Sequence, residues 1–300
     1  MPLRSWLFVP GDSVKKLGKA AGFGADAIIV DLEDSVAPAA KPAARELACE
    51  WLKAHRTHVT QGSGFARWVR INALDTPWWR DDLAAVMPGA PAGVILPKAS
   101  GPAALQAVAG ELYSLEQRHV IAPGATQILP LVSETPAAAL GIAAYVDAAH
   151  IRLAGLTWGA EDLSAALGAA RKRDDHGQWT DVFRYVRAQT LLAAAARGVP
   201  AIETLWDDFA DDAGLDRAAT AARADGFTGM LAIHPRQVPI INAAFTPSAA
   251  EIAEAEAVVA TFAANPEAGT LSLNGRMLDQ PHLKLARRVL GLDYNSRAAV

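Results

Sequence analysis

The chain has 300 residues, of which 51% are hydrophobic and 20% are charged, and its formal net charge is −4. This composition is typical of a protein with a sizeable core, and it provides no excess of basic residues for binding nucleic acid. No apolar run approaches the ~20 residues of a membrane helix, and Pro10-Gly11 interrupts the N-terminal run too early for a signal peptide. The single cysteine, Cys49, excludes an internal disulfide. We therefore expect a cytoplasmic protein with no nucleic-acid or membrane partner.

Short apolar or β-rich runs alternate with segments whose apolar residues have helical spacing, such as residues 14–22, 39–55 and 180–197. This alternation predicts βαβ units, and eight of them match the size of a (β/α)8 TIM barrel, an α/β fold with a parallel sheet. A doubly wound open sheet is the alternative, although no GxGxxG motif follows the first run. The eight runs are residues 6–10, 27–34, 68–72, 93–98, 127–134, 152–162, 200–205 and 230–235.

The pattern changes near residue 246. Ser248 and Glu251 have the spacing of a helix-capping box, which predicts a helix to about residue 264. Residues 270–278 predict a hairpin on a type I′ Asn-Gly turn, and a last helix follows at about 281–290. The predicted tail is therefore a helix, a hairpin and a helix.

These patterns divide the chain into a barrel domain, residues 1–246, and a C-terminal tail, residues 247–300. The tail is too small for an independent core, so we expect it to pack on the barrel or on a neighbouring subunit. The last residues, 296–300, are expected to fray.

Two of the predicted strands end in carboxylates, which packing alone does not explain. They are Glu134 and Asp162. Because ligands bind at the carboxyl ends of parallel strands, we predict that the two side chains meet there. Hard cations such as Mg²⁺ prefer carboxylate oxygens and often keep only one or two of them. Glu134 and Asp162 are thus candidate ligands for Mg²⁺, or alternatively Mn²⁺; the competing interpretation is that each marks the start of a helix.

A further acidic cluster, residues 31–34, follows the second predicted strand, and Arg70 lies within the run at 68–72. A guanidinium at a strand end can bind a substrate carboxylate or stabilise an oxyanion. Arg70 could instead form a buried ion pair with the acidic cluster. Glu33 or Asp34 could hold metal-bound water or orient a basic residue, but capping of a helix at 38–48 together with pairing with Lys41 or Arg45 is the simpler interpretation.

Lys98 could form a Schiff base with a carbonyl substrate or pair with a carboxylate. We favour the ion pair, because the candidate metal site would supply the same electrophilic assistance. Basic residues near the first strand ends, among them Arg4 and Lys41, could contact phosphates. The basic run at 171–173 could do the same, although short charge runs usually form a solvated face.

Asp279 follows the predicted hairpin. It could cap the last helix. If the tail reaches an active site, Asp279 could instead donate or accept a proton.

Short motifs distributed along nearly the whole chain resemble, in this order, the citrate lyase β-subunit family, which includes malyl-CoA, citramalyl-CoA and citryl-CoA lyases. The motifs are RSWLFVPGD (residues 4–12), ADAIIVDLEDSV (25–36), VRIN (69–72), LPK (96–98), SET (133–135), GAEDL (159–163), AIHPRQ (232–237) and GRMLDQP (275–281).

The resemblance implies a (β/α)8 barrel that binds Mg²⁺ and a CoA thioester and assembles as a homotrimer or hexamer. It implies that Glu134 and Asp162 hold the metal and that Arg70 contacts the substrate carboxylate and the developing oxyanion. Asp279 matches an acid that family members contribute to a neighbouring subunit through the tail.

The reaction that the resemblance implies is cleavage of a hydroxyacyl-CoA into an acyl-CoA and a 2-keto acid, or the reverse Claisen-type condensation. Arg4 and Lys41 match parts of the CoA-phosphate surface. Two alternatives remain open: a citrate lyase β subunit that acts within a complex on an acyl-carrier-protein thioester, and a Schiff-base aldolase that uses Lys98. Malyl, citramalyl and citryl groups differ too little for the sequence to select among them.

Overall fold

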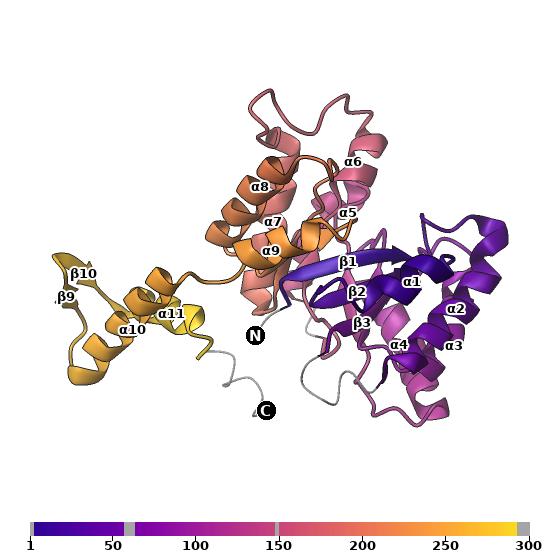
Figure 1. The fold of residues 1–300 in the computed structure, drawn as a ribbon, viewed down its shortest axis with the longest axis horizontal. Helices are drawn as coiled ribbons and strands as arrows, with labels where there is room; N and C mark the ends of the chain where they lie inside the picture. The colour runs from indigo at the N-terminus through magenta and orange to yellow at the C-terminus, as the bar shows by residue number, and fades with distance from the viewer. Residues whose placement is uncertain (1–2, 57–63, 148–149, 293–300) are drawn as a thin grey trace. The chain divides into compact units, whose positions relative to one another are not determined.

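The structure is a computed structural model that describes residues 3–56, 64–147 and 150–292. The described residues up to Phe245 form one compact unit, and those from Thr246 onward form a second, smaller one. Figure 1 shows the course of the chain through both units.

The larger unit is built on eight parallel strands in the order β5-β4-β3-β2-β1-β8-β7-β6. Two isolated parallel bridges, Ile128 with Leu153 and Leu131 with Thr157, connect the β5 and β6 edges and nearly close the ring. The predicted TIM barrel is therefore confirmed in preference to an open sheet. The strands are β1 Ser5–Pro10, β2 Ala27–Asp31, β3 Ala66–Arg70, β4 Gly93–Leu96, β5 Gln127–Pro130, β6 Leu156–Thr157, β7 Ala201–Glu203 and β8 Gly229–Ala232.

Helices follow the strands along the chain, and α2, α3 and α4 lie together beside β1–β3 in Figure 1. None of the described helices is long and apolar enough to cross a membrane. The helices of this unit are α1 Val14–Ala20, α2 Lys41–Ala54, α3 Trp79–Val86, α4 Pro102–Arg118, α5 Pro136–Leu140, α6 Ala160–Leu167, α7 Asp181–Arg197, α8 Asp212–Asp225 and α9 Gln237–Ala244. Short 3₁₀ turns are η1 Pro38–Ala40, η3 Met87–Gly89 and η4 Ile142–Val146.

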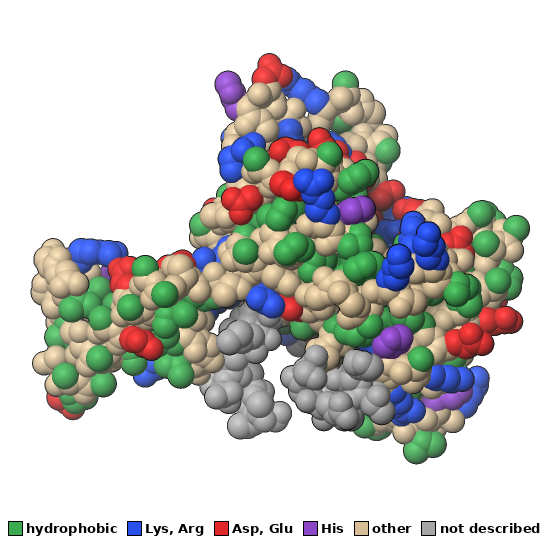
Figure 2. Space-filling view, viewed as in Figure 1, with side chains coloured by type: hydrophobic (Ala, Val, Ile, Leu, Met, Phe, Trp, Pro, Cys, Tyr) green, Lys and Arg blue, Asp and Glu red, His purple; other side chains and the backbone are tan. Residues whose placement is uncertain are grey.

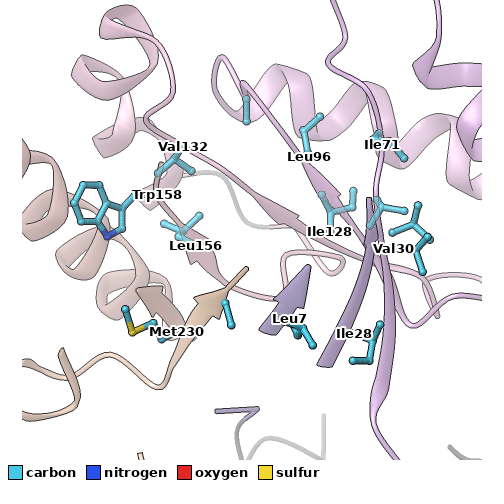
Figure 3. Close-up of a cluster of buried hydrophobic side chains, with 14 of the residues drawn as sticks. Leu7, Ile28, Val30, Ile71, Leu96, Ile128, Val132, Leu156, Trp158 and Met230 are labelled. Carbon is cyan, nitrogen blue, oxygen red and sulfur yellow. The ribbon is translucent and has the colours of Figure 1, made fainter. Parts of the chain in front are cut away.

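Strand alternation separates the core into two apolar layers. One layer contains Ile28 and Val30 of β2 and extends to side chains of the other strands and of the helices, part of which Figure 3 shows. The other layer, which includes Ile29 of β2 and Trp68 of β3, forms a separate cluster of strand side chains. The period of two places Asp31 and Arg70 on this second face, and β2 and β3 pair with these two residues opposite each other.

The sequence overestimates the length of the strands that end in acidic residues. The run at 152–162 contains a strand of only two residues, Leu156–Thr157, and Asp162 lies in the first turn of α6, whose N-cap is Gly159. Similarly, β2 ends at Asp31, before the rest of the acidic cluster. Apart from Asp31, these acidic residues therefore lie beyond the ends of the strands, in the loops and in the first turn of α6.

The smaller unit contains α10 Ala249–Ala264, β9 Leu271–Leu273, β10 Arg276–Leu278 and α11 Gln280–Val289. Both hydrogen bonds of the predicted Ser248–Glu251 capping box are present. Asn274 and Gly275 have φ values of 52° and 76°, as a type I′ hairpin turn requires. The predicted order of helix, hairpin and helix is confirmed, and residues 296–300 lie outside the described part of the chain.

Candidate active site

A cavity of about 400 Å³ lies at the carboxyl ends of the barrel strands, where TIM barrels carry their active sites. Its walls include three residues that the sequence selected, Arg70 at the end of β3, Glu134 in the loop after β5 and Asp162 in the first turn of α6. The larger apolar side chains of the walls are Phe8, Leu131, Trp158, Leu205, Leu231 and Ile233. The fold thus brings the separate strand-end charges into one partly apolar cavity.

Arg70 is fixed by the acidic cluster. Its Nε and Nη2 donate to the two carboxylate oxygens of Asp31 at 2.7 and 2.8 Å, and Nη1 lies 3.0 Å from Glu33 Oε2. Burial alone would lower the pKa of Arg70, but the Asp31 carboxylate outweighs it and raises the pKa. This confirms the predicted buried ion pair, and it keeps a cation in a defined orientation at the cavity wall. The expected ion pairs of the acidic cluster with Lys41 or Arg45 are not observed. Lys41 contacts backbone oxygens, and Arg45 pairs with Asp82.

Lys98 connects the acidic cluster with the two candidate metal ligands. It has a φ of 48°, a left-handed conformation that is uncommon for non-glycine residues, and its backbone N–H donates to Glu134 Oε2. Its Nζ lies 2.6 Å from Glu33 Oε1 and 3.6 Å from Asp162 Oδ1. The predicted ion pair of Lys98 is therefore confirmed.

This environment is unfavourable for a Schiff-base lysine. Burial alone would lower the pKa of Lys98, but the hydrogen bond to Glu33 and the nearby carboxylates outweigh it and raise the pKa. A lysine nucleophile needs the opposite change, because only the neutral amine attacks a carbonyl.

Glu134 is buried beside the backbone of Gly159. A Cβ atom at Gly159 would lie 2.8 Å from Glu134 Cγ and 3.2 Å from Oε1, so this close approach requires glycine. Ser133 also connects the two loops, since its Oγ contacts both the N–H and the carbonyl oxygen of Gly159, at 3.0 and 3.2 Å. The loops after β5 and β6 are therefore held together where the candidate metal ligands project.

The charge around Glu134 suits a bound cation. Burial raises the pKa of Glu134 to about 8; the Lys98 N–H opposes this change, and the carboxylates of Glu33 and Asp162 add to it. A divalent cation would relieve that repulsion. Within the described ranges no three His, Cys, Asp or Glu side chains form a metal-binding group. Glu134 and Asp162 still fit Mg²⁺, which often uses one or two carboxylates plus water and substrate.

Glu203, to which no role was assigned from the sequence, lies behind the cavity wall. The Trp158 indole N–H donates to Glu203 Oε1 at 2.7 Å, and Arg187 Nε donates to Glu203 Oε2. Trp158 has no exposed surface and lines the cavity directly before Gly159. A carboxylate within the apolar seventh run was visible in the sequence, but only the fold shows that it accepts a hydrogen bond from an indole.

The two residues predicted to contact CoA phosphates are not among the residues that line this cavity. Arg4 precedes β1, at the opposite end of the barrel from the cavity, and its Nε and Nη2 bind Asp26 at 2.8 and 2.9 Å. Lys41 is 4% exposed, and its Nζ donates to the carbonyl oxygens of Leu32 and Glu33. Their side chains thus stabilise the barrel and the loop after β2.

Asp279 is the N-cap residue of α11. Its Oδ1 lies 2.5 Å from His282 Nδ1, and its backbone nitrogen lies 3.3 Å from the same ring nitrogen, the contacts of a capping box. The capping interpretation is therefore confirmed. A catalytic role for Asp279 in a neighbouring subunit stays a prediction.

Comparisons with known proteins show which family the sequence matches. The family model described as HpcH/HpaI aldolase/citrate lyase matches residues 4–235. A citrate lyase subunit beta-like protein of Mycobacterium tuberculosis is 38% identical over 286 residues, which cover 95% of this chain and 93% of that protein. A (3S)-malyl-CoA thioesterase of Cereibacter sphaeroides is 36% identical and covers 96% of this chain and 94% of its own.

A solved structure extends the similarity to the fold. Protein CitE of Mycobacterium tuberculosis, in complex with magnesium, acetoacetate and coenzyme A, has a TM-score of 0.76 and 36% sequence identity. The match covers 96% of this chain and 97% of CitE.

Proposed function

Because the chain belongs to the HpcH/HpaI aldolase/citrate lyase family, we propose that it is a Mg²⁺-dependent carbon–carbon lyase. The substrate class is a hydroxyacyl-CoA thioester such as malyl-, citramalyl- or citryl-CoA, which is cleaved to, or formed from, an acyl-CoA and a 2-keto acid. The observation that carries this proposal is the meeting of Glu134, Asp162 and Arg70 in one cavity at the carboxyl ends of the strands. The CitE complex with magnesium, acetoacetate and coenzyme A supports the same ligand classes.

Glu134 and Asp162 would hold the Mg²⁺ ion, with Mn²⁺ as an alternative. When bound, the ion would act as a Lewis acid toward the oxygens of the substrate carboxylate and adjacent hydroxyl or carbonyl group. The Arg70 guanidinium, oriented by Asp31, would stabilise the negative charge that forms on the substrate hydroxyl oxygen when it loses its proton. As the carbon–carbon bond breaks, this oxygen becomes the keto-acid carbonyl oxygen and the charge passes to the acyl-CoA enolate. The apolar wall formed by residues such as Trp158 and Leu231 would limit access of water to that charge.

Asp279 would deliver the proton to the acyl-CoA enolate from the tail of a neighbouring copy, within a homotrimer or hexamer. This assignment rests on the matching GRMLDQP motif and predicts complementation between inactive variants. Arg70→Ala and Asp279→Asn should each be nearly inactive alone, whereas mixed oligomers should regain part of the activity. Mixtures that stay inactive, although mass measurements show mixed oligomers, would exclude a shared site.

A free-standing enzyme in the cytoplasm fits these proposals better than the alternatives. A Schiff-base mechanism is disfavoured because carboxylates keep Lys98 charged. The single cysteine, Cys49, is buried and unpaired, as is usual in a reducing compartment. Size-exclusion mass of the protein alone, combined with a CoA-thioester assay, would separate a self-contained homo-oligomer from a subunit of a lyase complex.

The decisive experiment is a panel of hydroxyacyl-CoA thioesters assayed with and without Mg²⁺, with identification of both products. A lyase forms a 2-keto acid and leaves an acyl-CoA thioester. A thioesterase, the activity named for the relative from Cereibacter sphaeroides, forms free CoA and the hydroxy acid instead. Turnover that persists after EDTA treatment, or release of free CoA as the first product, would overturn the proposed lyase.

A further inference from the structure

A second cavity, of about 310 Å³, lies among α7, α8 and the connection from α6 to α7. These elements appear together at the top of Figure 1, and Figure 2 shows basic and acidic side chains close together at that end. Thr204 is the single residue that lines both this cavity and the candidate active site among the described residues. The second cavity is therefore a separate space that shares a wall with the first.

Arg173 is a preoriented cation at the wall of this cavity. Its guanidinium carbon lies 3.4 Å from the ring centroid of Trp179 and 4.4 Å from that of Trp206. Nη1 donates to the Gly177 carbonyl oxygen at 3.0 Å. No ion pair of Arg173 with a carboxylate exists among the residues that the structure describes, and burial lowers the pKa of Arg173 to about 10.

The other charges of the cavity leave a positive excess. Both lining carboxylates, Glu203 and Asp225, are already bound by Arg187. Arg217 on α8, like Arg173, forms no ion pair within the described ranges. The cavity thus holds two guanidinium groups without carboxylate partners, and one of them is held in place by two indoles.

We propose that this cavity binds a small oxyanion, either a phosphate or a dicarboxylate, through Arg173 and Arg217. The planar guanidinium fork matches both types of oxyanion. The preorganised Arg173 loses little conformational freedom on binding. The cavity, of about 310 Å³, is large enough to admit either oxyanion.

The bound anion would contact the back of the active-site wall. Trp179 packs edge-on against Trp158, with ring centroids 5.0 Å apart, and Trp158 lines the candidate active site. Lys172, next to Arg173, binds Glu161 in the first turn of α6, beside Asp162. Occupancy of the second cavity should therefore change the KM for the thioester, an effect that rests on the proposed function, whereas the binding itself does not.

The test is calorimetric titration of inorganic phosphate, and separately of succinate, into the full chain at constant ionic strength and in the presence of EDTA. We expect saturable binding of one or both probes, weakened roughly tenfold or more by Arg173→Gln and by Arg217→Gln, since hydrogen bonds to charged groups have this magnitude. Arg171→Gln is the matched control, because Arg171 lies two positions away, is 66% exposed and does not line the cavity. It should bind like the wild type.

Three outcomes would overturn the proposal. The first is the absence of saturable heat with both probes. The second is unchanged binding by Arg217→Gln, an exposed substitution that should fold even if Arg173→Gln does not. The third is a binding heat for chloride, at matched ionic strength, equal to that for phosphate and succinate, which would indicate general screening of charge. A preference for phosphate over succinate, or the reverse, would identify the ligand class.

Discussion

Replacing Gly159 with alanine tests whether the close approach of two loops positions the metal-binding carboxylate. The new Cβ would lie 2.8 Å from Glu134 Cγ, whereas carbon atoms pack at about 3.5–4.0 Å, so one group must move by about 1 Å. Gly159 is held by Ser133, and its φ and ψ of −116° and 120° are accessible to alanine. The displacement therefore falls on Glu134 and is not caused by backbone strain.

A misplacement of about 1 Å in an active site can reduce the rate about hundredfold. We expect Gly159→Ala to lower kcat/KM by about that factor and to weaken Mg²⁺ affinity roughly 10–100-fold, measured by Mg²⁺ titration of activity and by calorimetry. Gly110→Ala is the matched control, because Gly110 lies in α4 and a Cβ atom added there would meet no other group within 4 Å. That variant should keep full activity. Wild-type Mg²⁺ affinity and turnover in Gly159→Ala would refute the reasoning.

Three further predictions concern the site and the barrel. Arg70→Ala should reduce kcat roughly 10²–10³-fold at saturating substrate; full activity in the folded variant would contradict the oxyanion role. Borohydride treatment with a 2-keto acid should leave Lys98 unmodified in mass spectra, and a covalent adduct there would restore the Schiff-base alternative. Burial would raise the pKa of Glu116, but hydrogen bonds from Arg152 and from two backbone N–H groups outweigh it and lower the pKa to about 2. Because this folded-state pKa lies below the unfolded value, ionised Glu116 stabilises the folded state by about 3 kcal/mol. This stabilisation is complete above about pH 4.5 and is lost as the pH falls toward 2. Urea unfolding of Glu116→Gln should show that loss at pH 7 and a smaller difference from the wild type at pH 3; an equal difference at both values would refute it.

The candidate site illustrates which features are readable from the sequence. Glu134 and Asp162 stood out because each follows an apolar run, and a carboxylate at such a position has no packing explanation. Arg70 stood out because a cation inside an apolar run requires an anion nearby. Its partner could not be identified, since Asp31 lies 39 positions away and becomes its neighbour only through the pairing of β2 with β3.

Arg4 and Lys41 show the reverse case. Both are basic residues near strand ends, so the sequence suggested contact with phosphates. In the folded chain Arg4 binds Asp26 and Lys41 binds backbone oxygens, and neither side chain lines the cavity. Charge alone does not show whether a side chain faces a ligand or completes a hydrogen-bonding network of the protein.

Periodicity and capping chemistry are local properties, so the chain order of strands and helices, the barrel class and the capped helices of the tail could all be derived from residue spacing. The contacts that give the site its chemistry are not local. Lys98 reaches Glu33 across 65 positions, Glu134 approaches Gly159, and Trp158 binds Glu203 across 45 positions. Such contacts depend on which strands become neighbours in the ring. The pairing of β6 with β7 brings Trp158 to Glu203, and the bridges between β5 and β6 that close the ring bring Glu134 to Gly159.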